Sequence, residues 1–359
     1  MNSRTIKQRI KTIRRQLNKK NINCLIVTKP ANITYITGFS GSDSWAVITP
    51  KNVYLLTDSR YIEQAQNQCP HCQIIQSSGP IIETTARLFK KLNSIQAAAV
   101  EDSVSVAAFK AMKKNLGGRL KPAANIIESV RRTKTDDEIA AIEAAVRIAA
   151  QALKQTLRSI KPGLTENELA GILDFQIRKL GAVNSFETIV AFGSNASRPH
   201  HQPSSTKLKK NDTILIDFGV RYKNYCCDLT RCFTVGRTTG FYKKVYDAVQ
   251  KAHVAALKMV KAGVELRQVD SAARKVITES DLPVYGHGTG HGLGLEVHEA
   301  PSLSGKSKGK LETGMVITIE PAVYLPGKLG VRLEDNILVT PNGYKILTRN
   351  CPHNHLLPV

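Results

Sequence analysis

Long apolar runs are missing from this 359-residue sequence, and no segment approaches the roughly 20 residues that a membrane-spanning helix requires. The first residues also lack the hydrophobic core of a secretory signal peptide. We therefore expect no membrane partner and a cytoplasmic location. Because 42% of the residues are hydrophobic, the chain can still bury a substantial core, and its length suits two domains of ordinary size.

Cysteines are few and odd in number: the chain has seven, and only Cys69 and Cys72 form a C-x-x-C motif. We therefore expect a reducing compartment rather than a disulfide scaffold. The Pro-His pair between these cysteines is typical of oxidising thioredoxin-fold proteins, in which the motif opens a helix. Here the motif follows a helical pattern and precedes an apolar run. We favour two surface thiols over a redox role.

Acidic residues are scarce, with 29 Asp and Glu against 51 Lys and Arg. The surplus is largest in residues 1–130, which carry 19 basic and 7 acidic residues. A basic balance can indicate nucleic acid or an anionic surface as a partner. The sequence contains no zinc-finger, RNP or KH pattern, so we do not expect nucleic-acid binding and interpret the charge as proteome background.

The first 20 residues contain eight Lys or Arg and no acid, a composition that a mitochondrial transit peptide shares. However, Ile6, Ile10, Ile13 and Leu17 recur at helical spacing. The pattern runs directly into the apolar segment 24–27 without a cleavable spacer. We therefore favour an amphipathic first helix of the folded domain.

Residues 22–130 alternate between strand-like and helical runs, which predicts an α/β domain. The helical runs are 61–68, 82–92 and 104–116. A linker at 128–137 follows, in which Thr135 and Glu138 have the spacing of a capping box that opens the next helix. The sequence thus predicts two domains, 1–130 and 131–359. In the second, two helices and a hairpin occur twice, which suggests a duplicated α+β half.

Two strand-like runs flank the polar segment 221–224 and predict a β-hairpin. Asp217 and Asp228 are equidistant from its centre, so we expect them directly opposite each other, with Cβ atoms roughly 4.5–5.5 Å apart. Facing like charges destabilise a sheet unless a positive charge lies between them. A divalent cation would supply it. On this hairpin alone, a strand end and a turn cap explain the two residues equally well.

A second hairpin favours the metal interpretation. Glu320 and Glu334 are equidistant from Gly327, although Pro321 makes this strand irregular. Between the hairpins lies a glycine-rich segment with His287, His291 and His298, without the spacing of a nucleotide-binding loop. We expect its glycines to let the backbone approach the metals. Four carboxylates and an imidazole suit a two-metal site and favour Mn, Fe or Co over thiolate zinc.

These motifs resemble the pita-bread metallopeptidases, which include Xaa-Pro aminopeptidase (aminopeptidase P), Xaa-Pro dipeptidase (prolidase) and methionine aminopeptidase. The matching phrases, within about residues 130 to 350, are DFG, DLTR, HGTGHGLG, VHEAP, TIEP and VRLEDN. One departure is Ala322, where the Xaa-Pro branch usually has glycine. Residues 35–49 and 55–65 resemble the N-terminal domain of creatinase, prolidase and aminopeptidase P, which favours the Xaa-Pro branch.

The resemblance implies a creatinase-type α/β domain followed by a pita-bread α+β catalytic domain with a pseudo-twofold axis, and a homodimer or higher homo-oligomer. It also implies two divalent ions, Mn²⁺ by preference, with Co²⁺, Fe²⁺ and Zn²⁺ as alternatives. The implied metal ligands are Asp217, Asp228, His291, Glu320 and Glu334.

The resemblance further implies that a metal-bridging hydroxide attacks the carbonyl before proline. Glu320 would be the general base, His298 would contact the carbonyl oxygen, and His200 would lie on the leaving-group side. His287 and Arg332 would bind substrate or support the ligands; Arg332 could equally form an ion pair with Glu334 or Asp335. We treat His201 as a bystander.

The implied activity is hydrolysis of the Xaa-Pro bond at the N-terminus of peptides with proline second. A prolidase restricted to dipeptides is the nearest alternative. A non-catalytic pita-bread binding protein and a metal-free creatinase are further alternatives, and both are disfavoured because all five ligand positions hold the expected residue types.

Overall fold

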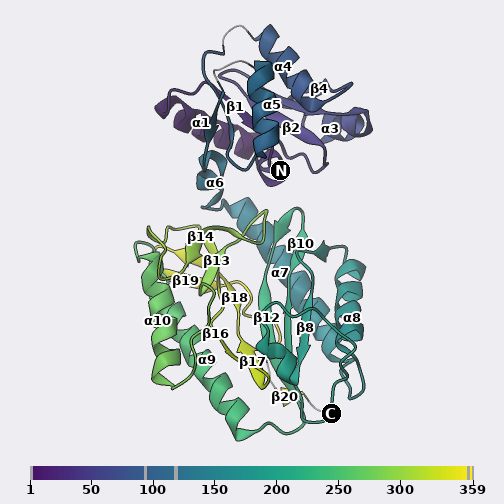
Figure 1. Ribbon diagram of the computed structural model, residues 1–359, viewed down its shortest axis with the longest axis vertical. Coiled ribbons are helices and arrows are strands. Elements are labelled where there is room, and N and C mark those ends of the chain that lie inside the picture. Colours follow the sequence, from purple (N-terminus) through teal and green to yellow (C-terminus); the bar gives the residue numbers. More distant parts are fainter. Residues whose placement is uncertain (1–2, 93–94, 117–119, 354–355, 358–359) are drawn as a thin grey trace. The chain divides into compact units, whose positions relative to one another are not determined.

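The computed structural model describes residues 3–92, 95–116, 120–353 and 356–357, which form two compact units, Met1–Arg131 and Arg132–Val359. No helix among the described residues is long and apolar enough to cross a membrane. Figure 1 shows the helices and strands of each unit.

The first unit is a six-stranded mixed sheet flanked by helices (Figure 1). The strand order is β4 (Gln73–Gln76), β3 (Val53–Thr57), β2 (Ser44–Ile48), β1 (Cys24–Val27), β5 (Ala98–Glu101) and β6 (Leu120–Ala123). The helices are α1 (Ser3–Lys19), α2 (Pro30–Thr37), α3 (Ile62–Gln68), α4 (Ile81–Lys91), α5 (Val106–Leu116) and α6 (Ile126–Arg131), with the short 3₁₀ helix η1 (Ser59–Tyr61). The predicted α/β class is confirmed.

The amphipathic first helix is also confirmed, because α1 buries Ile6, Ile10, Ile13 and Leu17. Sequence reasoning missed α2. Its signals were the proline at the first helical position and Gly38 at the C-terminal end, where φ is +79°. Cys69 and Cys72 lie between α3 and β4, as the sequence predicted. The expectation of two surface thiols was wrong, because Cys69 is fully buried and Cys72 is half-buried.

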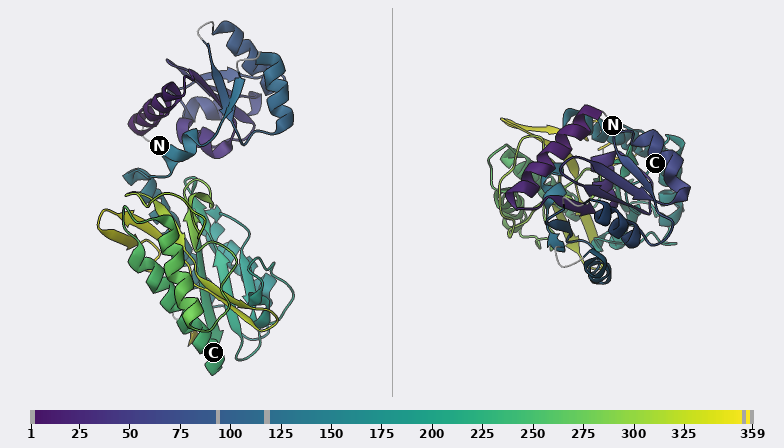
Figure 2. Two further views of the ribbon diagram at one scale, coloured as in Figure 1. Left: turned by 60° about the vertical axis from the view of Figure 1, so that its left-hand side comes forward. Right: turned by 90° about the horizontal axis from the view of Figure 1, so that it is seen from above.

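The second unit contains two helix pairs with strands between them (Figure 1). The first half comprises α7 (Asp136–Leu157), α8 (Glu166–Lys179), β7 (Val183–Asn184), β8 (Ile189–Phe192), η2 (Gly193–Ser197), β9 (Thr213–Phe218), β10 (Val220–Tyr222), β11 (Tyr225–Cys226) and β12 (Leu229–Val235). The second half comprises α9 (Gly240–Met259), α10 (Leu266–Glu279), β13 (Gly290–Gly292), β14 (Glu299–Leu303), β15 (Val316–Ile319), β16 (Ala322–Leu325), β17 (Leu329–Arg332), β18 (Asp335–Thr340), β19 (Gly343–Ile346) and the C-terminal β20 (Leu356–Leu357). Helices α9 and α10 pack side by side (Figure 2).

The two halves repeat the same backbone hydrogen bonds, which supports the predicted duplication. Gly163 N–H donates to the carbonyl of Leu208 at 2.8 Å, and Gly263 N–H donates to that of Leu311 at the same distance. Both glycines have positive φ, +93° and +89°, which a glycine adopts without strain. The equivalent turns then start α8 and α10.

The register of the first hairpin differs from our expectation. Asp217 pairs with Thr230 rather than facing Asp228, because the turn consists of Lys223 and Asn224, one residue further along. Both turn residues have positive φ, +48° and +70°, as a two-residue type I′ turn requires. Asp228 precedes Thr230 by two positions, so the two aspartates are diagonal neighbours and not direct partners.

The second hairpin has the predicted register. Val323 pairs with Val331 and Leu325 with Leu329, so the ladder is centred on Gly327. The same register continues in β15 and β18, where Ile319 pairs with Asp335. The ladder is interrupted between these pairs, at Glu320 and Pro321 on one side and at Glu334 on the other, as expected from the proline. Glu320 and Glu334 therefore lie at the same level of the hairpin.

Candidate metal centre and substrate cavity

A cavity of about 590 Å³ opens between the two halves of the second unit. All of its lining residues belong to this unit. The lining includes every site residue that the sequence singled out: His200, Asp217, Asp228, His287, His291, His298, Glu320, Arg332 and Glu334. The structure therefore brings together residues that span 135 positions of the chain.

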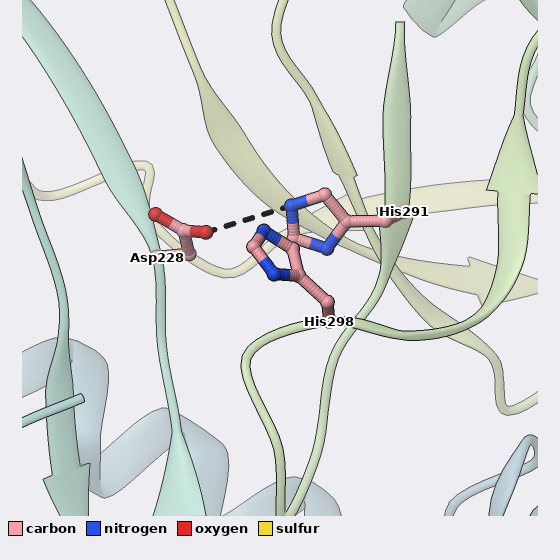
Figure 3. Close-up of side chains that lie close together, drawn as sticks. All are labelled: Asp228, His291 and His298. Atoms are coloured by element: carbon pink, nitrogen blue, oxygen red, sulfur yellow. Dashed lines mark ion pairs between the residues drawn. The ribbon is translucent and has the colours of Figure 1, made fainter. Parts of the chain in front are cut away.

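The carboxylates and imidazoles at the base of the cavity fall into three overlapping groups that could hold a metal ion. These are Asp217, Asp228 and Glu334; His291, Glu320 and Glu334; and Asp228, His291 and His298. In each group, one ligand atom from every residue lies within 4.8 Å of the others. Figure 3 shows His291 and His298 beside Asp228, with the interaction between His291 and Asp228 drawn.

The carboxylates of this cluster fit bound cations. Among the described residues, Oδ1 of Asp217 and Oδ1 of Asp228 are buried and have no hydrogen-bond partner. Burial, reinforced by the neighbouring acids, raises the pKa of Asp228 and that of Glu334 well above their ordinary values. Burial also raises the pKa of Glu320 to about 7. Buried carboxylates that lie close together and lack hydrogen-bond partners destabilise the folded state unless a positive charge compensates them.

His291 has the geometry of a neutral metal ligand. Its Nδ1 lies 3.0 Å from the carbonyl oxygen of Gly292 and donates to it, which leaves the Nε2 lone pair free. Nε2 lies 3.5 Å from Glu320 and 3.6 Å from Asp228. Burial lowers the pKa of His291 to about 4. The neutral imidazole therefore points at the acids that would share a cation with it.

The glycines beside His291 serve a different purpose from the one we expected. A Cβ on Gly290 would lie 2.0 Å from the carbonyl oxygen of Thr318, and one on Gly292 would lie 2.3 Å from that of Ala300. The close approach is thus to the backbones of the neighbouring strands and not to the metal site. Only glycine lets β13 fit between β14 and β15.

Arg332 pairs with Asp217, and not with Glu334 or Asp335, the partners that the alternative interpretation gave it. Its Nη1 donates to the Tyr324 hydroxyl at 2.6 Å, and its Nε donates to Oγ1 of Thr230 at 3.1 Å. Thr230 in turn donates to Glu334 at 2.7 Å. The buried guanidinium therefore orients one carboxylate of the cluster directly and another through Thr230.

Tyr324 was missed from the sequence. Its hydroxyl accepts from Arg332 and lies 3.1 Å from Nε2 of His287, to which it donates. His287 Nδ1 donates to the carbonyl of Gly288 at 2.8 Å, and burial lowers the pKa of His287 to about 4. The available sequence signal was the even spacing of Glu320 and Tyr324, since residues four apart would share a face of an uninterrupted strand.

His200 is exposed at the cavity wall, and its neighbour His201 fixes the segment that carries it. His201 is buried, with Nε2 2.8 Å from Glu166 at the start of α8. Glu166 also accepts hydrogen bonds from Ser204 Oγ at 2.6 Å and from Phe192 N at 2.7 Å. Burial alone would raise the pKa of Glu166, but the hydrogen bonds outweigh it and lower that pKa. His201 is therefore a structural anchor and more than a bystander.

Comparison with family models gives two matches. Residues 140–341 match metallopeptidase family M24, and residues 9–133 match the creatinase/prolidase N-terminal domain.

Individual proteins also resemble the chain over nearly its whole length. An uncharacterised peptidase of Bacillus subtilis is 35% identical over 345 residues, 95% of this chain and 98% of that protein. The solved structure of an Xaa-Pro dipeptidase from Bacillus anthracis has a TM-score of 0.94 at 35% identity and covers 99% of this chain and 100% of its own. An X-Pro aminopeptidase from Thermotoga maritima has a TM-score of 0.87 at 34% identity, covering 96% and 100%.

Proposed function

Because the chain belongs to metallopeptidase family M24 and carries a creatinase-type N-terminal domain, we propose that it is an Xaa-Pro aminopeptidase that cleaves before proline in peptides longer than two residues. That it is a metal-dependent peptidase of pita-bread fold follows from the family and from its structural relatives. The proposal concerns the finer points: the length of the substrate, the metal, and the role of each residue.

The charge of the cavity lining carries the preference for longer peptides. In a dipeptide, the free carboxylate lies directly on the proline and needs a cation when it is bound. Among the described lining residues there is no lysine, and Arg332 is already engaged with Asp217, Tyr324 and Thr230. A peptide amide at that place requires no such cation. A longer substrate therefore suits this cavity better.

A dipeptidase is the second candidate. The Bacillus anthracis relative with a TM-score of 0.94 is an Xaa-Pro dipeptidase, and similarity on that scale favours shared specificity. His200 and His298 are exposed in the cavity, and their ring N–H groups could donate hydrogen bonds to a dipeptide carboxylate.

We assign two divalent ions, Mn²⁺ by preference, to the carboxylate cluster. Asp217 and Asp228 would hold one ion, and Asp228, His291, Glu320 and Glu334 would hold or bridge the other; the orphaned Oδ1 atoms support this assignment. Such ions polarise a carbonyl and lower the pKa of water. Oxygen-rich ligation suits Mn²⁺ better than it suits a thiolate-preferring metal.

The chain's own residues would do the remaining work. Glu320, which lines the cavity, takes a proton from the attacking water, a role that a carboxylate within reach of that water can fill. His298 donates to the oxygen of the scissile carbonyl as negative charge develops there. His200 contacts the leaving-group side, while His287 and Arg332 hold the substrate or the carboxylates beside it.

The test is hydrolysis of Ala-Pro and Ala-Pro-Ala side by side after loading with Mn²⁺, with Ala-Ala-Ala and an EDTA-treated sample as controls. We expect cleavage of the tripeptide at the Ala-Pro bond, abolished by EDTA, and little cleavage of Ala-Pro or Ala-Ala-Ala. Cleavage of the dipeptide alone would replace the proposal with the dipeptidase. If the metal-loaded protein cuts neither proline peptide, the proposed activity is wrong.

A further inference from the structure

His298 depends on its backbone for its position. Its side chain is exposed in the cavity, and among the described residues its ring makes no hydrogen bond. Its ring contact is with His291, at a centroid separation of 4.4 Å (Figure 3). A side chain that must meet the carbonyl oxygen of a substrate therefore relies on the segment that carries it.

That segment, 293–299, is anchored at its beginning by the backbone. Leu293 N–H donates to the carbonyl of Val316 at 3.1 Å, and Cys226 N–H donates to that of Gly294 at 2.7 Å. Gly294 N–H then donates to the carbonyl of Glu296 at 2.9 Å, which closes a tight turn. These bonds fix Leu293, Gly294 and Glu296, which lie two to five residues before His298.

The second half is anchored by a buried ion pair. Nζ of Lys134 lies 3.2 Å from Oε2 of Glu299, the residue that follows His298. The two side chains are only 1% and 6% exposed. The other carboxylate oxygen of Glu299 accepts from Glu296 N–H at 3.1 Å, so Glu299 also ties the turn together from within.

Lys134 is itself held in place by backbone groups, one of which is far away in the sequence. Its backbone N–H donates to the carbonyl of Gly314 at 2.8 Å, and Nζ lies 3.3 Å from the carbonyl of Arg132. It immediately precedes Thr135, which caps α7 through its contacts with Glu138. The ammonium is thus a fixed point against which Glu299 is held.

We infer that the Lys134–Glu299 ion pair is a positioning device that holds His298 in place for the reaction. Removal of the ammonium takes from the buried Glu299 carboxylate the cation that lies 3.2 Å away, and we expect the segment to shift as water or another group replaces it. A shift of about 1 Å at a catalytic group can cost about 100-fold in rate. The inference rests on the proposed function, since it assumes that His298 acts on the substrate.

The test compares Lys134→Met with a matched control, Lys345→Met. Lys345 also pairs with a glutamate, Glu143 at 2.7 Å, but it is 61% exposed. We expect Lys134→Met to lower kcat for Ala-Pro-Ala by about 30- to 100-fold with KM changed less than about threefold, because His298 acts mainly in the transition state. Metal content should match the parent, and Lys345→Met should be unchanged in all respects.

A double-mutant cycle separates positioning from a general loss of stability. If Lys134 acts through His298, Lys134→Met should cost less than about twofold further in a His298→Ala background. An equal cost in both backgrounds would overturn the inference. If Lys134→Met does not fold, Glu299→Gln breaks the same pair with a side chain of the same size, and the same cycle applies.

A measurement without turnover keeps the inference apart from the proposed function. We expect amide hydrogen exchange of residues 295–299 to accelerate about tenfold or more in Lys134→Met, and to stay at the parent rate in Lys345→Met. Unchanged exchange in both variants would overturn the inference even in an active enzyme. Faster exchange in a protein that proves not to hydrolyse Ala-Pro-Ala would support the anchoring of the segment and reject the proposed activity alone.

Discussion

The two oxygens of Asp217 have different surroundings at the base of the cavity. Oδ2 accepts from Arg332, while Oδ1 is buried without a partner among the described residues. A carboxylate that is half satisfied in this way can orient itself through one oxygen and bind a cation through the other. An arginine close to the proposed metal ligands is useful for this reason, because it orients a carboxylate without occupying the oxygen that would bind the cation.

At this scale we predict that Asp217→Asn abolishes metal loading and turnover together. The amide keeps the size of the side chain but loses the negative charge that a divalent cation needs, so metal affinity should fall by more than about 100-fold, beyond the range for supporting residues. Elemental analysis after dialysis measures this, alongside Ala-Pro-Ala hydrolysis. Asp247→Asn, at an exposed aspartate of α9, is the control. An active Asp217→Asn variant would refute the ligand assignment.

At the scale of elements, two hairpins supply the four carboxylates, and each is set by its turn. The first has Lys223 and Asn224 at positive φ, which fixes the pairing of Asp217 with Thr230. The second turns at Gly327, with φ of +69°. A turn that is longer or shorter by one residue would shift the pairing register by one position and move the acids of one strand to the opposite face of the sheet.

We therefore predict that Asn224→Val destabilises the protein, whereas Asn224→Gly does not. A β-branched residue is strained at φ of +70° by about 1–2 kcal/mol, and glycine is not. Urea unfolding of the metal-loaded protein measures the difference between the two variants. Equal midpoints for valine and glycine would show that the turn does not hold the register.

At the scale of the whole molecule, the acid cluster makes stability depend on pH when metal is absent. Burial raises the pKa of Glu320 to about 7 from an ordinary value of 4.5. Between these values the folded chain keeps a proton that the unfolded chain has lost. The contribution of Glu320 to the free energy of unfolding is therefore fully present below pH 4.5. It is lost as the pH rises through 7, a decrease of about 3 kcal/mol.

The prediction is that the thermal midpoint of EDTA-treated protein falls relative to that of Mn²⁺-loaded protein as the pH rises from about 4.5 to 7. Asp228 and Glu334, whose pKa values are also raised, act in the same direction. Groups that titrate equally with and without metal cancel in this difference. If the thermal midpoints of the EDTA-treated and Mn²⁺-loaded proteins changed in parallel over that pH range, the pKa values of these acids would not be raised in the metal-free protein, and the prediction would be wrong.

The sequence by itself determined the local elements and the composition of the site. Helices and strands have fixed periods, so the spacing of Ile6, Ile10 and Ile13 predicted α1, and the interval between Glu320 and Glu334 predicted a turn at Gly327. The two hairpins and the glycine-rich segment between them supplied seven of the nine predicted residues that now line one cavity, and motif resemblance added His200 and Arg332. Where a turn type was not recognised, at Lys223 and Asn224, the predicted register was wrong by one residue in the turn.

Only the tertiary structure decided which groups hold these residues in place. Arg332 reaches Asp217 across 115 positions, His201 reaches Glu166 across 35, and Lys134 reaches Glu299 across 165. No local period encodes such contacts, because they arise where elements from distant parts of the chain pack and bury polar groups that must then be paired. Local sequence patterns were thus enough to predict the chemical groups of the site. Their partners follow from tertiary packing, because buried charges and polar groups must be paired.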